Sequence, residues 1–130
     1  GDGWIDAYVS EDMGASWSLL SRVGETGGSI GNPPGLVRLT DGRLFCAYGN
    51  RDRRDIVGRF SLDDGATWEP ELLLRDGYHA DSFDEASDLG YPRVTQNADG
   101  QLVVTYYWPA AEPPHTYIAA TIFDPGAVAP

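Results

Sequence analysis

An eight-residue pattern occurs twice in this chain. Ser, Asp, Gly and Trp take the same places in Ser10–Trp17 and in Ser61–Trp68, and Ser61 lies 51 positions after Ser10. Such a segment between two apolar runs predicts a tight β-turn, in which Asp accepts backbone N–H groups, Gly supplies a positive φ and Trp covers the turn. Two copies predict an internal repeat.

The shared residues of the pattern are expected to form the turns rather than to react or to bind metal. They are Ser10, Asp12, Gly14 and Trp17 in the first copy, and Ser61, Asp63, Gly65 and Trp68 in the second. Asp64, next to Asp63, is interpreted in the same way.

A second repeat supports the first. Pro34, Asp41, Gly42, Leu44 and Tyr48 recur 58 positions later, and Ile56 recurs as Ile118, 62 positions later. Alternating apolar residues between these turns predict β-strands throughout and no helix. We expect about nine strands in groups of two, four and three, with strands at Trp4–Val9, Trp17–Val23, Gly35–Thr40, Leu44–Tyr48, Ile56–Phe60, Glu71–Leu74 and Tyr117–Phe123, and two more that begin near Tyr91 and Leu102.

Composition narrows the possible partners. The chain has 130 residues, and its 20 acidic residues against 9 basic ones give a net charge of −11, which argues against nucleic acid and anionic membranes. Cys46, the only cysteine, excludes an internal disulfide and is expected in the core. His79 and His115 have no second histidine at ligand spacing, so neither a metal nor another cofactor is expected.

The repeated pattern, S-x-D-x-G-x-[ST]-W, resembles the Asp-box of the sialidase superfamily, also called the bacterial neuraminidase repeat. The resemblance implies an all-β, partial β-propeller, with the end of one blade in 1–23, a complete four-stranded blade in 34–75 and a partial blade in 91–123. Propellers need at least four blades, so 130 residues with this period are too few to close a ring. In the family the box lies on the rim away from the substrate.

The segments around Tyr48–Arg51, Asp88–Pro92 and Tyr117–Thr121 are similar to the C-terminal portion of bacterial sialidase-like proteins. This resemblance implies that Tyr91 is the catalytic nucleophile and that Arg51, Arg54 and Asp88 bind substrate. Arg53 and Arg54 compete with Arg51 for the carboxylate-binding role, and either Asp88 or Glu85 is a candidate base. Pro92 stands where many sialidases carry serine, and Val57 stands where relatives often carry another arginine. Tyr91 as a packing residue is the alternative.

These observations predict a portion of a sialidase-like glycoside hydrolase that acts on acidic, sialylated glycans and is inactive as the isolated chain. The alternative is a non-catalytic propeller fragment that binds carbohydrate or protein and assembles with itself. Open blade edges, with exposed faces such as Val103, Thr105 and Tyr107, predict a homo-oligomer. The family resemblance implies a secreted or periplasmic protein, although no signal sequence opens the chain.

Overall fold

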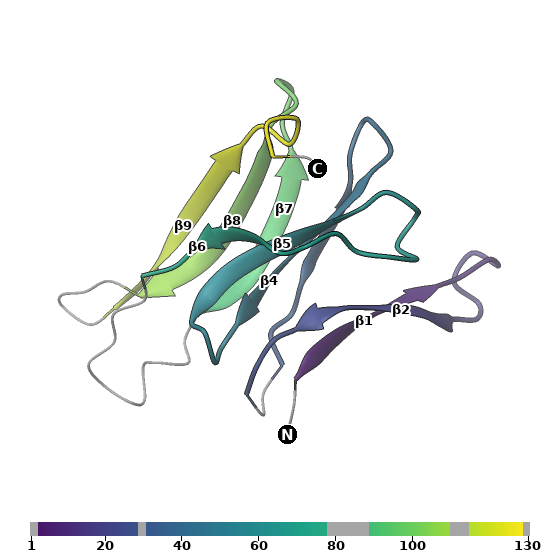
Figure 1. Cartoon of the computed structure of the whole chain (residues 1–130), viewed down its shortest axis with the longest axis horizontal. Helices are drawn as coiled ribbons and strands as arrows, with labels where there is room; N and C mark the ends of the chain where they lie inside the picture. The colour runs from purple at the N-terminus through teal and green to yellow at the C-terminus, as the bar shows by residue number, and fades with distance from the viewer. Residues whose placement is uncertain (1–2, 29–30, 78–88, 110–114, 129–130) are drawn as a thin grey trace.

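The computed structural model describes residues 3–28, 31–77, 89–109 and 115–128. These residues form nine strands and no helix (Figure 1). In chain order the strands are β1 (Trp4–Val9), β2 (Ser18–Glu25), β3 (Gly35–Arg38), β4 (Leu44–Asn50), β5 (Asp55–Ser61), β6 (Leu72–Arg75), β7 (Gly90–Gln96), β8 (Leu102–Pro109) and β9 (Thr116–Phe123). A search of this part of the chain for a helix able to cross a membrane finds none.

The strands form three antiparallel sheets, here called the first, middle and third sheet. Their orders are β1-β2, β3-β4-β5-β6 and β7-β8-β9, so each strand pairs with the strand that follows it in the sheet. The expected all-β class and the grouping into two, four and three strands are therefore confirmed for the described residues.

The middle and third sheets share one register. Gly49 lies opposite Ile56 in the middle sheet, and Tyr107 lies opposite Ile118 in the third. These pairs are related by the sequence offsets of 58 and 62, and the same relation holds for the pairs further along both ladders. The residues that repeat in the sequence therefore occupy equivalent paired positions in the two sheets.

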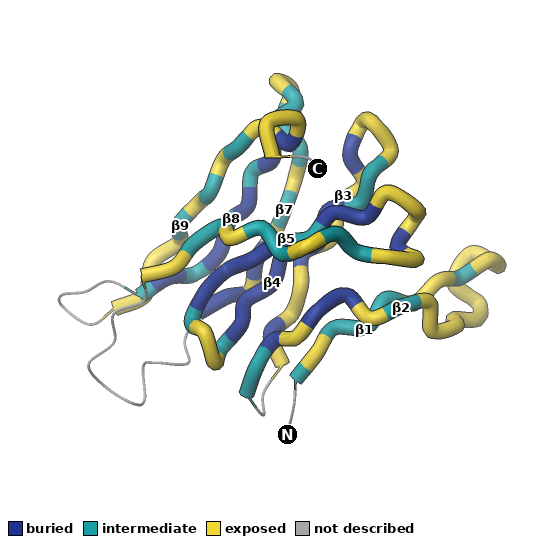
Figure 2. Tube along the Cα trace, in the orientation of Figure 1, coloured by how far each residue is buried: buried dark blue, intermediate teal, exposed yellow. Residues whose placement is uncertain are grey.

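The middle sheet is covered on both faces, and its central strands β4 and β5 are buried almost throughout (Figure 2). One face packs on the third sheet in a cluster of Leu39, Phe45, Ala47, Ile56, Phe60, Leu89, Leu102, Val104, Tyr106 and Trp108. The other face packs on the first sheet through Val23, Cys46, Tyr48 and Val57, with Ile5 and Ala7 beside them. Cys46 is a core residue, as predicted.

Most strand boundaries differ by one or two residues from the sequence-based expectation, and two of these differences have a clear structural cause. Strand β2 continues through Gly24 to Glu25, because β1 pairs with it to the end and the Thr26 N–H then donates to the Gly3 carbonyl at 2.8 Å. Strand β6 begins after Glu71, whose side chain is engaged by residues of the middle sheet. Gly24 and Glu25, which were expected in a loop, therefore belong to β2. Glu71, which was expected in a strand, precedes β6 and accepts a hydrogen bond from Tyr48.

Candidate functional site

The antiparallel strands give the molecule two ends (Figure 1). The turn end holds the hairpin turns of residues 10–17, 40–42, 62–68 and 97–100. The opposite end, here called the Tyr91 end, holds the short hairpin of residues 51–54 and the start of β7. The predicted site residues Tyr91, Arg51 and Arg54 all belong to this second end.

The two copies of the eight-residue pattern form the same turn. In each, the serine hydroxyl accepts the glycine N–H, at 2.7 Å in the first copy and 2.8 Å in the second. The carboxylates of Asp12 and Asp63 each accept an N–H at 2.8 Å and a hydroxyl at 2.6 Å, from Ser16 and Thr67 respectively. These bonds lower the pKa of Asp12 to about 2 and also lower that of Asp63, the hydroxyl bond having the largest effect in both. Their geometry fits the predicted role as turn formers.

The second copy is packed against the first sheet. The Trp68 indole Nε1 donates to the Ser21 hydroxyl at 3.0 Å, and that hydroxyl donates to the Gly65 carbonyl at 2.5 Å. The matching tryptophan of the first copy, Trp17, is 64% exposed. The same turn therefore serves packing between sheets in one copy and faces solvent in the other.

Tyr91 presents its ring to solvent at the entrance of β7. Its side chain is 46% exposed and stacks on Tyr107, with ring centroids 5.5 Å apart and planes within 10°. The backbone has a positive φ of 50°, and Gly90 before it has a φ of 111°. A tyrosine in this region is strained, and such strain persists only where the surroundings impose it.

Asn32 imposes that conformation. Its Nδ2 donates to the Leu89 carbonyl at 3.2 Å, and its Oδ1 accepts the Tyr91 N–H at 3.1 Å. The Asn32 side chain also lies so close to Gly49 and Gly90 that a Cβ at either glycine would meet it. The buried amide thus joins the end of β4 to the start of β7. Because Arg51 follows Gly49 by two residues, Asn32 brings the predicted arginine hairpin beside the strand that carries Tyr91.

The arginine hairpin, residues 51–54, is held by several hydrogen bonds. Asn50 Oδ1 accepts the N–H groups of Asp52 and Arg53, at 3.1 and 3.0 Å, and Asn50 Nδ2 donates to the Glu25 carbonyl at 3.0 Å. The Arg51 N–H donates to the Thr26 carbonyl at 2.7 Å. Arg51 and Arg54 are half-buried, and Arg54 has a positive φ of 59°. The first sheet therefore fixes the loop that carries both arginines.

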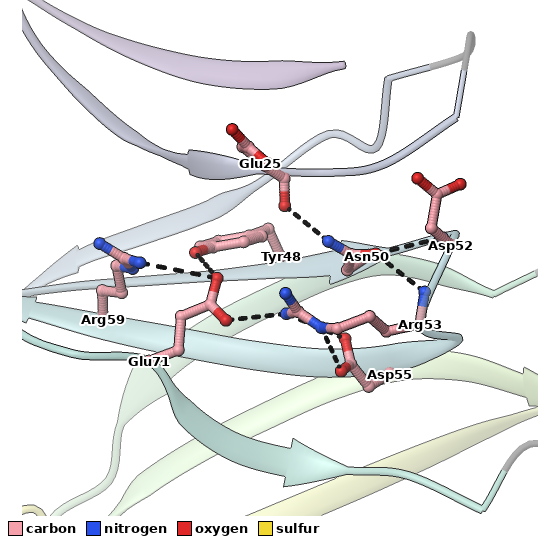
Figure 3. Close-up of polar contacts among 8 residues, drawn as sticks. All are labelled: Glu25, Tyr48, Asn50, Asp52, Arg53, Asp55, Arg59 and Glu71. Atoms are coloured by element: carbon pink, nitrogen blue, oxygen red, sulfur yellow. Dashed lines mark hydrogen bonds and ion pairs between the residues drawn. The ribbon is translucent and has the colours of Figure 1, made fainter. Parts of the chain in front are cut away.

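Arg53, the competing candidate, is engaged elsewhere. Its Nε donates to Asp55 and its terminal nitrogen to Glu71, both at 2.8 Å (Figure 3). Arg53 is therefore paired with two carboxylates of the chain itself. Asp88 and Glu85, the candidate bases, lie outside the described residues, as does His79. Val57 points into the core between the first and middle sheets.

Sequence reasoning missed a polar cluster centred on Tyr48 and Glu71 (Figure 3). The Tyr48 hydroxyl donates to Glu71 Oε1 at 2.8 Å, and an Arg59 nitrogen lies 3.8 Å from the same oxygen. Tyr48 is fully buried, and its pKa is raised by burial first and then by Glu71. Gly24 lies directly over the hydroxyl, where a Cβ would not fit. No substrate can reach this phenol, because it is buried beneath Gly24 of β2 and bonded to Glu71 of the middle sheet's own chain segment.

One signal in the sequence could have found this cluster. Tyr48 recurs as Tyr106, whereas Arg59 is replaced by Thr121 at the matched position of the third sheet. The Tyr106 and Thr121 hydroxyls lie 2.7 Å apart, and Thr121 also donates to the Leu74 carbonyl of the middle sheet. The tyrosine at this repeat position therefore has a polar partner in both sheets: Glu71 for Tyr48 and Thr121 for Tyr106.

No protein-family model matches the chain, and no curated protein matches it.

The Tyr91 end brings aromatic rings and arginines to one part of the molecule. The exposed Tyr91 ring of β7 stacks on the half-buried Tyr107 ring of β8, at the end that also holds the hairpin with Arg51 and Arg54. Among the described residues, no carboxylate is hydrogen-bonded to the Tyr91 hydroxyl, and no group of histidine, cysteine or acidic side chains could hold a metal ion. A phenol titrates near pH ~10 and needs a base to attack at neutral pH.

Proposed function

We propose that this chain is a portion of a sialidase-like β-propeller glycoside hydrolase, and that its Tyr91 end forms part of the surface that binds an acidic glycan. The supporting observation is the placement of two copies of the Asp-box-like turn at one end and of Tyr91, Arg51 and Arg54 at the other. The shared register of the middle and third sheets also favours successive blades of one propeller.

The side chains at this end fit the chemistry of an acidic sugar. The apolar faces of a pyranose ring pack well on aromatic rings, and the Tyr91 and Tyr107 pair offers such a surface. A guanidinium group meets a carboxylate with two parallel hydrogen bonds, which is the contact expected of Arg51 or Arg54. Sialic acid presents both features, a pyranose ring and a carboxylate at the anomeric carbon.

The isolated chain is proposed to bind without turnover. Sialidases depart from the usual pair of catalytic carboxylates by using a tyrosine nucleophile, and that tyrosine needs a base and an acid that act with it as a unit. The described residues supply a tyrosine and two arginines, and no carboxylate that contacts the Tyr91 hydroxyl. This observation also favours the second candidate, a non-catalytic propeller fragment that binds carbohydrate or protein.

Ligand-observed NMR with sialyllactose and with lactose tests the binding surface. We expect sialyllactose to bind at least several-fold more tightly than lactose, and Tyr91→Ala and Arg51→Ala each to weaken it several-fold. Tyr8→Ala is the matched control, because Tyr8 is a similarly exposed tyrosine in β1. Equal binding of the two sugars, or sialyllactose binding that survives Tyr91→Ala, would overturn the proposal.

A fluorogenic sialoside tests the absence of turnover. The wild-type chain and Tyr91→Phe should both release fluorophore at the rate of the blank. Release well above the blank that Tyr91→Phe abolishes would assign Tyr91 as a nucleophile in the isolated chain.

A further inference from the structure

Arg75, the last residue of β6, contacts the third sheet at the Tyr91 end (Figure 1). Its guanidinium carbon lies 5.0 Å from the centroid of the Trp108 ring, and a terminal nitrogen donates to the Tyr117 hydroxyl at 3.3 Å. The Thr121 hydroxyl donates to the carbonyl of Leu74, the residue before Arg75, at 3.3 Å. Side chains of β8 and β9 therefore orient the guanidinium group and hold the strand that carries it.

This arginine lies between two sheets that both belong to the chain. Trp108 is part of the core cluster between the middle and third sheets, and Tyr117 lies directly opposite it in the ladder, so both side chains are on the face toward the middle sheet. Trp108 is buried, whereas Tyr117 is 40% exposed and Arg75 is half-buried. The arginine and the tyrosine therefore contribute the accessible surface of this group.

Arg75 forms no ion pair with a carboxylate in the described part of the chain. Acidic residues outnumber basic ones by 20 to 9, yet the ion pairs recorded there are made by Arg22, Arg38, Arg43, Arg53 and Arg59. A guanidinium group carries several N–H donors, and a tyrosine hydroxyl that accepts one of them can still donate its own proton. Arg75 and Tyr117 can therefore both donate hydrogen bonds to one oxyanion.

The repeat shows that this group is not needed to join two sheets. In the middle sheet the positions equivalent to Trp108 and Tyr117 are Asn50 and Asp55. Asn50 donates to the Glu25 carbonyl of β2 at 3.0 Å, and Asp55 accepts a side-chain N–H from the adjacent hairpin at 2.8 Å. At that junction the polar groups bind each other, whereas at the second junction an arginine is presented by two aromatic side chains.

We propose that Arg75 and Tyr117 form a second anion-binding subsite at the Tyr91 end, which takes the carboxylate of a second acidic sugar. The inference rests on the proposed function, because the first acidic sugar is the one assigned to Tyr91 and the arginine hairpin. Neighbouring strands are about 4.8 Å apart, so β9, which carries Tyr117, lies roughly 10 Å from β7, which carries Tyr91. A short oligosaccharide with two neighbouring sialic acids is the ligand class that fits this spacing.

NMR titrations with disialyllactose and with sialyllactose test the subsite. We expect the wild-type chain to bind disialyllactose several-fold more tightly. Arg75→Gln and Tyr117→Phe should each remove most of this gain, so that the two sialosides bind alike. Arg38→Gln is the matched control, because Arg38 is an exposed arginine that donates to Gly42 and Asp64 at the turn end, and this variant should keep the gain.

The side-chain Nε–H signal of Arg75 separates the subsite from the proposed function. Free sialic acid should shift this signal in a saturable way even in the Tyr91→Ala variant, and its uncharged methyl ester should not. If sialyllactose shifts the signals of Tyr91 and residues 51–54 but disialyllactose binds no more tightly, the subsite is overturned and the proposed function stands.

The opposite failure is distinguishable. If neither sialoside binds, the proposed function fails, and the Arg75 signal alone decides on the subsite. A saturable shift with free sialic acid that the methyl ester does not cause would then support a carboxylate site at Arg75. An unchanged signal would overturn it, and so would an Arg75→Gln variant that loses only thermal stability and keeps the preference for disialyllactose, because Arg75 would then serve only to cover Trp108.

Discussion

Tyr91 owes its conformation to one side chain distant in sequence. Asn32 bonds on both sides of Gly90, to the Leu89 carbonyl and to the Tyr91 N–H, and is itself buried. A non-glycine residue held at positive φ costs of order 1–3 kcal/mol. The two hydrogen bonds to Asn32 offset this cost, and they set where the Tyr91 ring meets Tyr107.

The variant Asn32→Ala should release Tyr91. It leaves a buried carbonyl and a backbone N–H without their partner, which we expect to lower the free energy of unfolding by about 1–3 kcal/mol. Aromatic NMR signals of Tyr91 and Tyr107 should lose the upfield shift caused by their stacked rings.

Asn97→Ala is the matched control for that experiment. Asn97 accepts the N–H groups of Asp99 and Gln101 in a turn at the far end of β7, so its loss should lower stability but leave the Tyr91 ring signals unchanged. Retention of the stacked-ring shift in Asn32→Ala would contradict the role given to Asn32.

Tyr91 could be recognised as a candidate site residue from the sequence, whereas the role of Asn32 in holding it could not. Tyr91 stands out because it replaces Pro33 at a matched position of the repeat. Asn32 lies among glycines and prolines, and its partners are 57 and 59 residues away, so no local pattern marks it. The positive φ of Tyr91 follows from that long-range contact and could not be foreseen either.

The two repeated turns have the same local structure but different surroundings: the second packs on another sheet, and the first faces solvent. Each turn is held by an aspartate that accepts an N–H and a hydroxyl from one residue. The second turn also packs on β2 through Ser21 and Trp68. Loss of the second turn should therefore disturb the contact between two sheets, whereas loss of the first should disturb one hairpin.

Acid titration of stability tests this difference. The pKa of Asp63 is lower in the folded chain than the ordinary value of about 4. Its carboxylate therefore stabilises the fold above that pH, and the stabilisation is lost as the pH falls below it. Asp63→Asn should have a lower Tm than the wild type at pH 7, and the difference should shrink as the pH is lowered through this range.

Asp12→Asn provides the comparison. The pKa of Asp12 is lowered to about 2, so the same pH range applies, but the first turn is exposed and its loss should change the global Tm less. Curves of Tm against pH that run parallel for the wild type and Asp63→Asn would contradict the stabilising role of the ionised Asp63.

The strands were largely predictable because alternation and turn residues are local signals. The repeat offsets even fixed the register of β8 against β9, since equivalent positions pair equivalently. The recurrence of Tyr48 as Tyr106 could mark the polar cluster, but Glu71 as the partner was not predictable, because the contact depends on how a buried tyrosine of β4 reaches a residue beyond the second turn. Such contacts depend on tertiary packing, which the alternation of apolar and polar residues in the sequence does not predict.

At the scale of the whole molecule, the three sheets form a stack. The middle sheet packs on the third sheet with one face and on the first sheet with the other. Turns and packing occupy one end of the stack, and the Tyr91 end carries the stacked rings and the arginine hairpin. This separation of ends supports the proposal that the Tyr91 end binds a glycan.

Titration of the ¹⁵N-labelled chain with sialyllactose, followed residue by residue by NMR, tests that assignment most directly. We predict that the amide signals of Tyr91, Tyr107 and residues 51–54 shift with one common affinity, that signals of the turns at 10–17 and 62–68 stay in place, and that lactose causes much smaller shifts. Shifts centred on the two turns, equal shifts with lactose, or no shifts at saturating sugar would contradict the account.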